Sequence, residues 1–318
     1  MANASATNEE ASLRGVIILV NATLYALAFL GNAFVLCAFV KFPSLRGKEC
    51  LYLIASLALC DMSAGLFATF YWITLLLENF GLTNPYTKLQ CLSIGAPSQG
   101  AILAGQLITL RISFDRFELF RDQMGYHFKD HSRYAKQSLA FSLCFAYGFT
   151  SLAYIGVDYN TVLPFCRIAM CCTDFFFASL FAVIVLNGTA VLVFYLSATV
   201  LMRNTTKSYR ISVEKDRALE RQLKVSKTIN TVLFCYCSFW LAPLAMFFGI
   251  RSFGVPLYIV RIIETIVDVG VALNCSVNVL IYAAKYEDVR FHLTALLQGK
   301  PVNLVYPVGS RSGKKQKG

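Results

Sequence analysis

Long runs of apolar residues, separated by short polar segments, dominate the chain between residues 15 and 284. Each of seven runs approaches or exceeds the roughly 20 residues that a helix needs to cross a bilayer. Apolar residues follow one another without alternating polar ones, so the runs predict helices and not the strands of a membrane barrel. We therefore expect an all-α membrane protein, a seven-transmembrane helix bundle. The predicted spans cover residues 15–40, 50–77, 91–115, 137–157, 174–201, 228–250 and 259–284.

The composition agrees with a membrane protein and excludes several other classes. Hydrophobic residues make up 57% of the 318 residues and charged residues only 15%, whereas a soluble globular chain usually carries about 25% charged residues. The 8 prolines and 19 glycines follow no period, and this excludes a collagen-like chain. The apolar content is also far too high for a disordered one.

Basic residues are distributed unequally between the polar segments. The segments 41–49, 118–136, 202–227 and 285–318 contain 22 of the 29 Lys and Arg residues, and the segments on the opposite side contain four. Because cytoplasmic loops are rich in Lys and Arg, we expect the N-terminus outside the cell and the C-terminus in the cytosol. The net charge of +11 is then explained by the cytosolic face of the protein, which lies beside anionic lipid. We therefore expect no nucleic-acid partner.

Three parts follow from this topology: an extracellular tail (1–14), a seven-transmembrane domain (15–284) and a cytosolic tail (285–318). The first span is expected to act as a signal anchor, since no cleavable signal precedes it. Asn3-Ala4-Ser5 is a glycosylation acceptor on the outer side. The cytosolic tail begins with apolar residues at helical spacing, which predict a short amphipathic helix on membrane lipid. They are Tyr286, Val289, Leu293, Leu296 and Leu297.

Four of the eleven cysteines, Cys91, Cys166, Cys171 and Cys172, lie on the predicted outer side. An odd number excludes complete pairing within the chain, but the oxidising exterior permits a disulfide there. Cys166 lies in the middle of an outer loop and is free to approach Cys91, whereas Cys171 and Cys172 adjoin the fifth span. We favour a Cys91–Cys166 bond; the alternative is that all four thiols stay reduced.

Asp61 is the single charged residue of the second predicted span. A charge within a membrane is costly, so we expect Asp61 to face the interior of the bundle. Asn32 of the first span and Asn274 and Asn278 of the seventh span are candidate hydrogen-bond partners. These residues form either a site for a cation or proton, or a satisfied structural network.

Glu264 and Asp268 are spaced i, i+4 near the outer start of the seventh span, so both lie on one face of a helix. A ligand that arrives from outside would meet them there. The alternative is that Glu264 lies at the level of the lipid headgroups and pairs with Arg261. Ser98 and Gln99 of the third span are further ligand candidates, with helix–helix hydrogen bonding as their alternative role.

Four motifs, in order and on the expected spans, resemble those of the rhodopsin-like G-protein-coupled receptors over essentially the whole chain. They are Gly31-Asn32-Ala33-Phe34-Val35 for GNxxV, Leu57-Ala58-Leu59-Cys60-Asp61 for LAxxD, Asp115-Arg116-Phe117 for DRY, and Asn278-Val279-Leu280-Ile281-Tyr282 for NPxxY without its proline. Cys91 precedes Arg116 by 25 residues, as in that family.

Several positions depart from the common pattern. Trp240 stands three residues before Pro243 instead of two, the fourth span has no Trp and the fifth span has no Pro. Together with Leu45-Arg46-Gly47-Lys48 and the stretch from Gln106 to Phe117, these departures resemble the nematode serpentine chemoreceptors of the srsx type.

The resemblance implies a chemosensory receptor of the plasma membrane with no enzymatic activity and no cofactor. An unknown extracellular ligand would shift the bundle to a state that activates a heterotrimeric G protein. In the activation switch, Asp115, Arg116 and Phe117, the arginine would be held by Asp115 at rest, with Glu220 as a further partner. The polar relay would comprise Asn32, Asp61, Asn274, Asn278 and Tyr282. Gly105 stands where the family's sodium sites often carry Ser.

Two other classes compete with a receptor. A transporter or channel would need broken helices or rings of charge along a path, and the spans supply only Asp61, Glu264 and Asp268. A membrane enzyme would need reactive groups. His127 and His131 are spaced i, i+4 and suit a metal, but no third ligand accompanies them, and no nucleophile–base set is present.

Overall fold

The computed structural model describes residues 2–46, 51–163, 165–209, 231, 234–252, 257–285 and 287–299. This described part is almost entirely helical, and its only β-type pairing is the isolated bridge between Thr87 and Val162. The helices are α1 (Ala2–Lys41), α2 (Pro43–Arg46), α3 (Leu51–Asn79), α4 (Lys88–Arg121), α5 (Gln123–His127), α6 (His131–Ser151), η1 (Leu152–Tyr154), α7 (Ile168–Cys171), α8 (Asp174–Tyr209), the π-helical turn η2 (Cys237–Leu241), α10 (Ala242–Ser252), α11 (Leu257–Lys285) and α12 (Glu287–Leu297).

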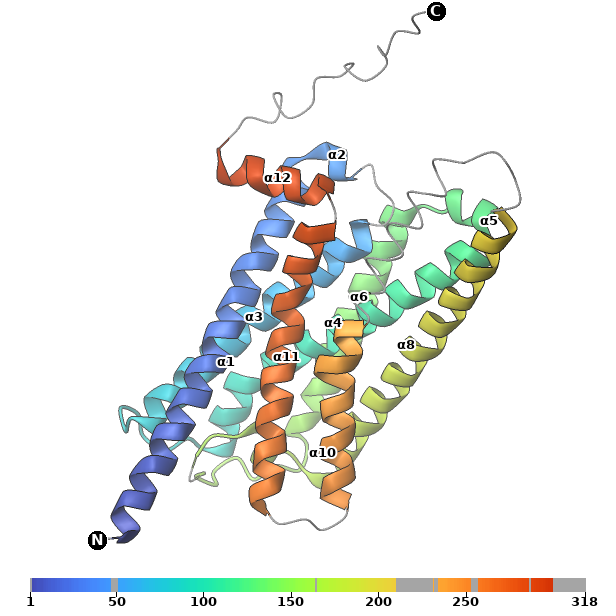
Figure 1. Cartoon of the computed structure of the whole chain (residues 1–318). Coiled ribbons are helices and arrows are strands. Elements are labelled where there is room, and N and C mark those ends of the chain that lie inside the picture. Colours follow the sequence, from blue (N-terminus) through green and yellow to red (C-terminus); the bar gives the residue numbers. More distant parts are fainter. Residues whose placement is uncertain are drawn as a thin grey trace, which may run out of the picture.

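The long helices lie side by side in one bundle, with α12 across one end and the N-terminus at the other (Figure 1). Helix α4 is central, since it packs against α3, α6 and α8, while α1 packs against α3 and α11. We call the end that contains Cys91 and Cys166 the disulfide end. The opposite end, with α12 and the last turn of α4, is the Arg116 end.

Apolar helices correspond to the predicted spans. Four described segments are long and apolar enough to cross a membrane by themselves: Ser12–Lys41, Leu51–Asn79, Asp174–Asn204 and Ile262–Ala284. They coincide with the first, second, fifth and seventh predicted spans. Helices α4 and α6 coincide with the third and fourth spans but carry more polar residues, and in the sixth span the described apolar helix is short.

Helix ends differ from the predicted span ends where capping groups and turns decide them. Helix α4 begins at Lys88, because Thr87 and Gln90 form a reciprocal capping box with side chain–backbone distances of 3.3 and 3.0 Å. Helix α6 begins at His131, because the Asp130 carboxylate accepts from the Arg133 amide at 2.9 Å. It ends at Ser151, and Gly156 then adopts a positive φ of 75°, a conformation that favours glycine.

The sixth span contains a π-helical turn, η2, immediately before Pro243. Proline has no amide N–H, so the Phe239 carbonyl cannot receive the usual i+4 hydrogen bond. The turn is closed instead by the Ala242 amide, which donates to the Cys237 carbonyl. Trp240 lies within this turn and is buried.

Candidate functional site

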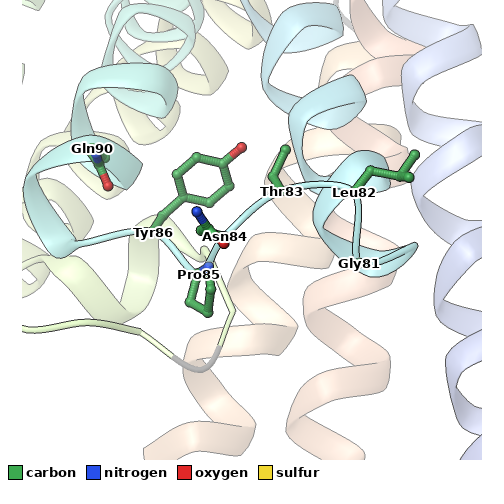
Figure 2. A pocket seen from close by; sticks show the side chains of 7 residues that line it. All are labelled: Gly81, Leu82, Thr83, Asn84, Pro85, Tyr86 and Gln90. Atoms are coloured by element: carbon green, nitrogen blue, oxygen red, sulfur yellow. The ribbon is translucent and has the colours of Figure 1, made fainter.

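A small hollow at the disulfide end is formed almost entirely by the connection between α3 and α4 (Figure 2). It measures about 430 Å³. Its lining residues are Gly81, Leu82, Thr83, Asn84, Pro85, Tyr86 and Gln90. None of the predicted ligand residues contributes to it, so we do not regard it as the ligand site.

A larger cavity of about 720 Å³ opens within the bundle at the same end. Its walls come from α1, α3, α4, α6, η1, α8, η2, α10 and α11, together with the segment between Phe165 and Cys172. The volume falls in the range of small-molecule sites, roughly 300–1,000 Å³. All four predicted ligand residues line it, namely Ser98, Gln99, Glu264 and Asp268.

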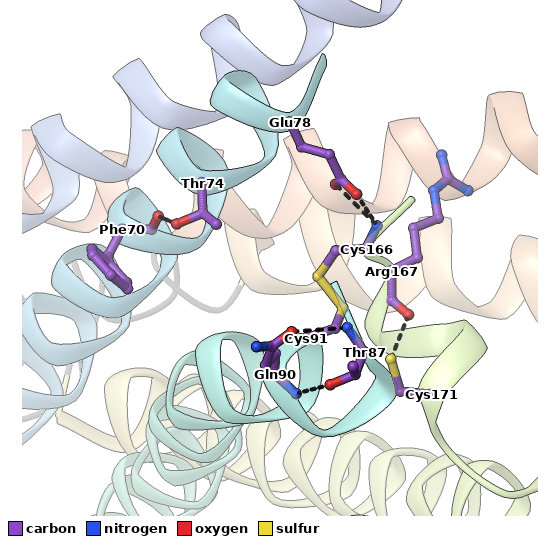
Figure 3. The surroundings of a disulfide bond; sticks show 9 residues. All are labelled: Phe70, Thr74, Glu78, Thr87, Gln90, Cys91, Cys166, Arg167 and Cys171. Carbon is purple, nitrogen blue, oxygen red and sulfur yellow. Dashed lines mark hydrogen bonds between the residues drawn. A yellow bond between two sulfur atoms is a disulfide. The ribbon is translucent and has the colours of Figure 1, made fainter. Parts of the chain in front are cut away.

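The disulfide fixes the loop that forms the outer wall of this cavity (Figure 3). Cys91 of α4 is bonded to Cys166, with their Cα atoms 5.4 Å apart, as expected from the sequence. The Glu78 carboxylate of α3 accepts from the Cys166 amide at 3.0 and 3.2 Å. Burial raises the pKa of Cys171 to about 11 and that of Cys172 to about 12, so both remain thiols at neutral pH.

Arg167 follows the disulfide and pairs with Glu264 of α11 at 2.5 Å. The partner that the sequence suggested, Arg261, has a side chain outside the described part of the structure. The Arg167 side chain is 39% exposed and that of Glu264 24%, so the pair contributes at most about 1 kcal/mol of stability. Its main effect is to hold the loop against α11 at the outer edge of the cavity.

The polar residues of α4 occupy different depths of the cavity wall. The Ser98 hydroxyl is buried and donates to the Gly95 carbonyl at 2.7 Å, a bond within its own helix. Gln99 is half-buried. Gln106 lies about 10 Å deeper than Gln99, given a rise of about 1.5 Å per residue, and it also lines the cavity.

Three members of the predicted polar relay lie in one buried contact region below the cavity. The Asn278 amide of α11 donates to the Asp61 carboxylate of α3 at 2.9 Å. The Asn32 amide of α1 donates to the Cys275 carbonyl of α11 at 3.2 Å and to the Ala28 carbonyl at 2.8 Å. Asp61 and two asparagines thus join α1, α3 and α11 through polar contacts.

The other two relay candidates lie on α11. The Asn274 side-chain oxygen is buried without a hydrogen-bond partner among the described residues. Tyr282 is buried in an apolar cluster that includes Phe42, Leu45 and Leu51. A Cβ on Gly105 would stand 3.6 Å from a carboxylate oxygen of Asp61, so the position is adjacent to the acid.

At the Arg116 end, Asp115 and Arg116 form a buried pair. An Arg116 guanidinium nitrogen lies 2.6 Å from the Asp115 carboxylate, and the side chains are 6% and 1% exposed respectively. The Tyr126 hydroxyl of α5 donates to the same carboxylate oxygen at 3.0 Å and lies 3.4 Å from the guanidinium. Phe117 packs on Phe194 of α8, with ring centroids 5.7 Å apart. Glu220, the other predicted partner, lies outside the described residues.

Sequence reasoning did not identify Tyr126, because only the fold of the connection between α4 and α6 brings it back to α4. The Asp122 side chain accepts from the Gly125 amide at 2.9 Å and starts α5. The His131 ring then lies 2.9 Å from the Tyr126 carbonyl and packs on the Tyr126 ring at 4.4 Å between centroids. His131 therefore positions Tyr126. The part of the chain that the structure describes contains no group of three residues suited to hold a metal ion.

Apolar helices in a single bundle, a cavity beneath a disulfide-anchored loop and buried polar contacts between helices together define a multi-pass helical membrane protein. Residues 25–297 match the family of serpentine-type seven-transmembrane GPCR chemoreceptors called Srsx. The chain belongs to this family, which is a family of receptors and not of enzymes. No curated protein matches the chain.

Proposed function

We propose that this protein is a chemosensory receptor of the plasma membrane with its N-terminus outside the cell. An extracellular ligand binds in the cavity at the disulfide end, and a heterotrimeric G protein engages the Arg116 end. The orientation rests on the basic residues, 22 of which lie in the four sequence segments 41–49, 118–136, 202–227 and 285–318.

The observation that carries this proposal is the arrangement along α4. The helix lines the cavity with Gln99 and Gln106 and ends near the buried pair of Asp115 and Arg116. Gln106 and Arg116 are ten residues apart, about 15 Å along the helix. A ligand that binds one packing of the helices more tightly than another shifts the equilibrium between them, and α4 connects the two ends directly.

The described arrangement corresponds to a resting receptor, because Arg116 is buried and held by Asp115 and Tyr126. Activation releases Arg116 from these contacts, so that it binds the G protein. Hydrogen bonds to charged groups contribute about 1.5–3 kcal/mol each. A ligand that binds the active state better by a few kcal/mol therefore suffices to reverse the equilibrium.

The test is a ligand panel applied to cells that carry the full chain at their surface, with G-protein activation as the measurement. We expect a response that disappears in Arg116→Ala and in cells without heterotrimeric G proteins. Arg133→Ala is the matched control, since Arg133 is exposed at the same end of the bundle. A response that survives Arg116→Ala and G-protein removal would contradict the proposal. Ligand-dependent uptake or current without G protein would support a transporter or channel instead.

A further inference from the structure

Asp268 is the one carboxylate of the cavity wall without a hydrogen-bond or ion-pair partner among the described residues. It lies one helical turn beyond Glu264 on the same face of α11. The other charged groups that line the cavity are engaged: Glu264 with Arg167, Glu78 with the Cys166 amide, and Arg14 over the Phe165 ring. Arg167 lies within electrostatic range of Asp268 but forms its ion pair with Glu264. A carboxylate without a close cationic partner favours a positively charged guest.

Two tyrosine side chains lie near this carboxylate. Tyr25 of α1 and Tyr71 of α3 lie within electrostatic range of Asp268, and both are buried in the cavity wall. Trp72 also lines the cavity, and its ring lies edge-on to Tyr71 with centroids 5.6 Å apart. A carboxylate near aromatic rings on a cavity wall suits an ammonium group, through charge pairing and cation–π attraction.

Two polar groups deeper in the cavity wall also lack hydrogen-bond partners among the described residues. The Gln106 side-chain oxygen and the Trp240 indole N–H are buried without hydrogen bonds in the described part of the chain. Both residues line the cavity, and they are only 5% and 4% exposed. Polar atoms buried without partners are costly, so their presence on a cavity wall indicates that polar atoms of a guest satisfy them.

The remaining wall is apolar and suits the hydrophobic part of a ligand. Phe176, Leu180, Ile184, Leu244 and Phe247 contribute to it, from α8 and α10. A volume of about 720 Å³ suits a small organic molecule and not a peptide of many residues.

We propose that the ligand class of this cavity is a small protonated amine with an aromatic or aliphatic body, whose ammonium group pairs with Asp268. The proposal rests on the proposed function, in that the cavity is taken as the receptor's ligand site. The amine lies against Tyr25 and Tyr71, and the body extends toward Gln106 and Trp240.

The experiment uses purified full-length protein in detergent and a panel of primary amines whose bodies grow from phenyl to naphthyl. Each amine is compared with its N-acetyl derivative and with the carboxylic acid of the same skeleton. We expect at least one amine to raise the melting temperature saturably, while its neutral and acidic counterparts do not. Equal binding of a counterpart, or no binding by any amine, overturns the proposal.

Variants of Asp268 test whether this carboxylate binds the ammonium group. Asp268→Asn keeps the shape but removes the charge, so we expect affinity for the amine to fall about tenfold to a hundredfold, the loss of a charge-assisted bond. Asp268→Glu should retain most of the affinity. Asp158→Asn is the matched control, since Asp158 is exposed in a loop outside the cavity. Unchanged affinity in Asp268→Asn overturns the proposal, and the unliganded melting temperature of each variant identifies any loss of folding.

A parallel measurement of G-protein activation separates this proposal from the proposed function. Amine binding that depends on Asp268 but activates no G protein refutes the receptor function and leaves the ligand class standing. Activation by a neutral or acidic compound, unaffected by Asp268→Asn, supports the receptor function and refutes the amine.

Discussion

Tyr126 places a phenol hydroxyl within hydrogen-bonding distance of both the Asp115 carboxylate and the Arg116 guanidinium. The motif Asp115-Arg116-Phe117 was recognisable from three adjacent letters. Tyr126 was not, because its contact with α4 depends on the turn that Asp122 starts and on packing against His131. A motif of adjacent residues can therefore be identified from the sequence, whereas a contact such as that of Tyr126 depends on how a loop folds.

We predict that Tyr126→Phe raises ligand-independent signalling. The change removes the hydroxyl that donates to Asp115 and accepts from Arg116, and it leaves the ring packed on His131. The resting state then loses about 1.5–3 kcal/mol, which raises the ratio of active to resting receptors about tenfold to a hundredfold or more. The measurement is nucleotide exchange on the G protein without ligand.

Tyr159→Phe serves as the control, because Tyr159 is exposed and its hydroxyl donates to the Tyr154 carbonyl in a loop at the disulfide end. Basal activity in Tyr126→Phe no higher than in this control would contradict the role assigned to Tyr126.

Individual helices were predictable because a continuous apolar run indicates a membrane-spanning helix without any knowledge of the helix's neighbours. The predicted spans at 50–77 and 259–284 correspond closely to α3 (Leu51–Asn79) and α11 (Leu257–Lys285). Helix α6 shows the limit: apolar residues continue to 157, but the helix ends at Ser151. Hydropathy reports residence in lipid, whereas caps and turns decide where a helix stops.

The π-helical turn η2 was not predictable, although its signal was present in the sequence. Trp240 stands one residue farther from Pro243 than the family pattern has it. A π-helical turn takes up one additional residue in a helix, so η2 accommodates the longer spacing. Trp240 is buried and lines the cavity.

Close packing of α11 on this turn depends on Gly270. A Cβ at Gly270 would overlap the Phe239 carbonyl oxygen, the acceptor that Pro243 leaves without its usual donor. We predict that Gly270→Ala destabilises the bundle by about 1–3 kcal/mol, the typical cost of overpacking, and lowers the melting temperature of the purified protein.

Gly148→Ala on α6 is the matched control, since nothing lies within 4 Å of an added Cβ there. Alanine favours helix over glycine by up to about 1 kcal/mol, so this control should melt at the same temperature or slightly higher. Equal melting temperatures for the two variants would show that α11 does not require glycine at position 270.

At the scale of the whole molecule, the bundle has two chemically different ends. The disulfide end contains the cavity and the Cys91–Cys166 bond. The four sequence segments predicted to be cytosolic contain 22 of the 29 Lys and Arg residues. Disulfides form in oxidising compartments, while Lys and Arg accumulate on the cytoplasmic side of membrane proteins. These two rules are independent of each other, and both favour a disulfide end that faces outward.

Glycosylation provides a test of this orientation within one chain, because the sequence contains an acceptor on each side. Asn3-Ala4-Ser5 precedes the first span, and Asn204-Thr205-Thr206 lies at the Arg116 end of α8. Sugar is added only in the lumen that becomes the outside, so we predict a glycosidase-sensitive shift on a gel. The shift should be lost in Asn3→Gln and kept in Asn204→Gln. The opposite pattern would reverse the topology and place the cavity in the cytosol, where no external ligand could reach it.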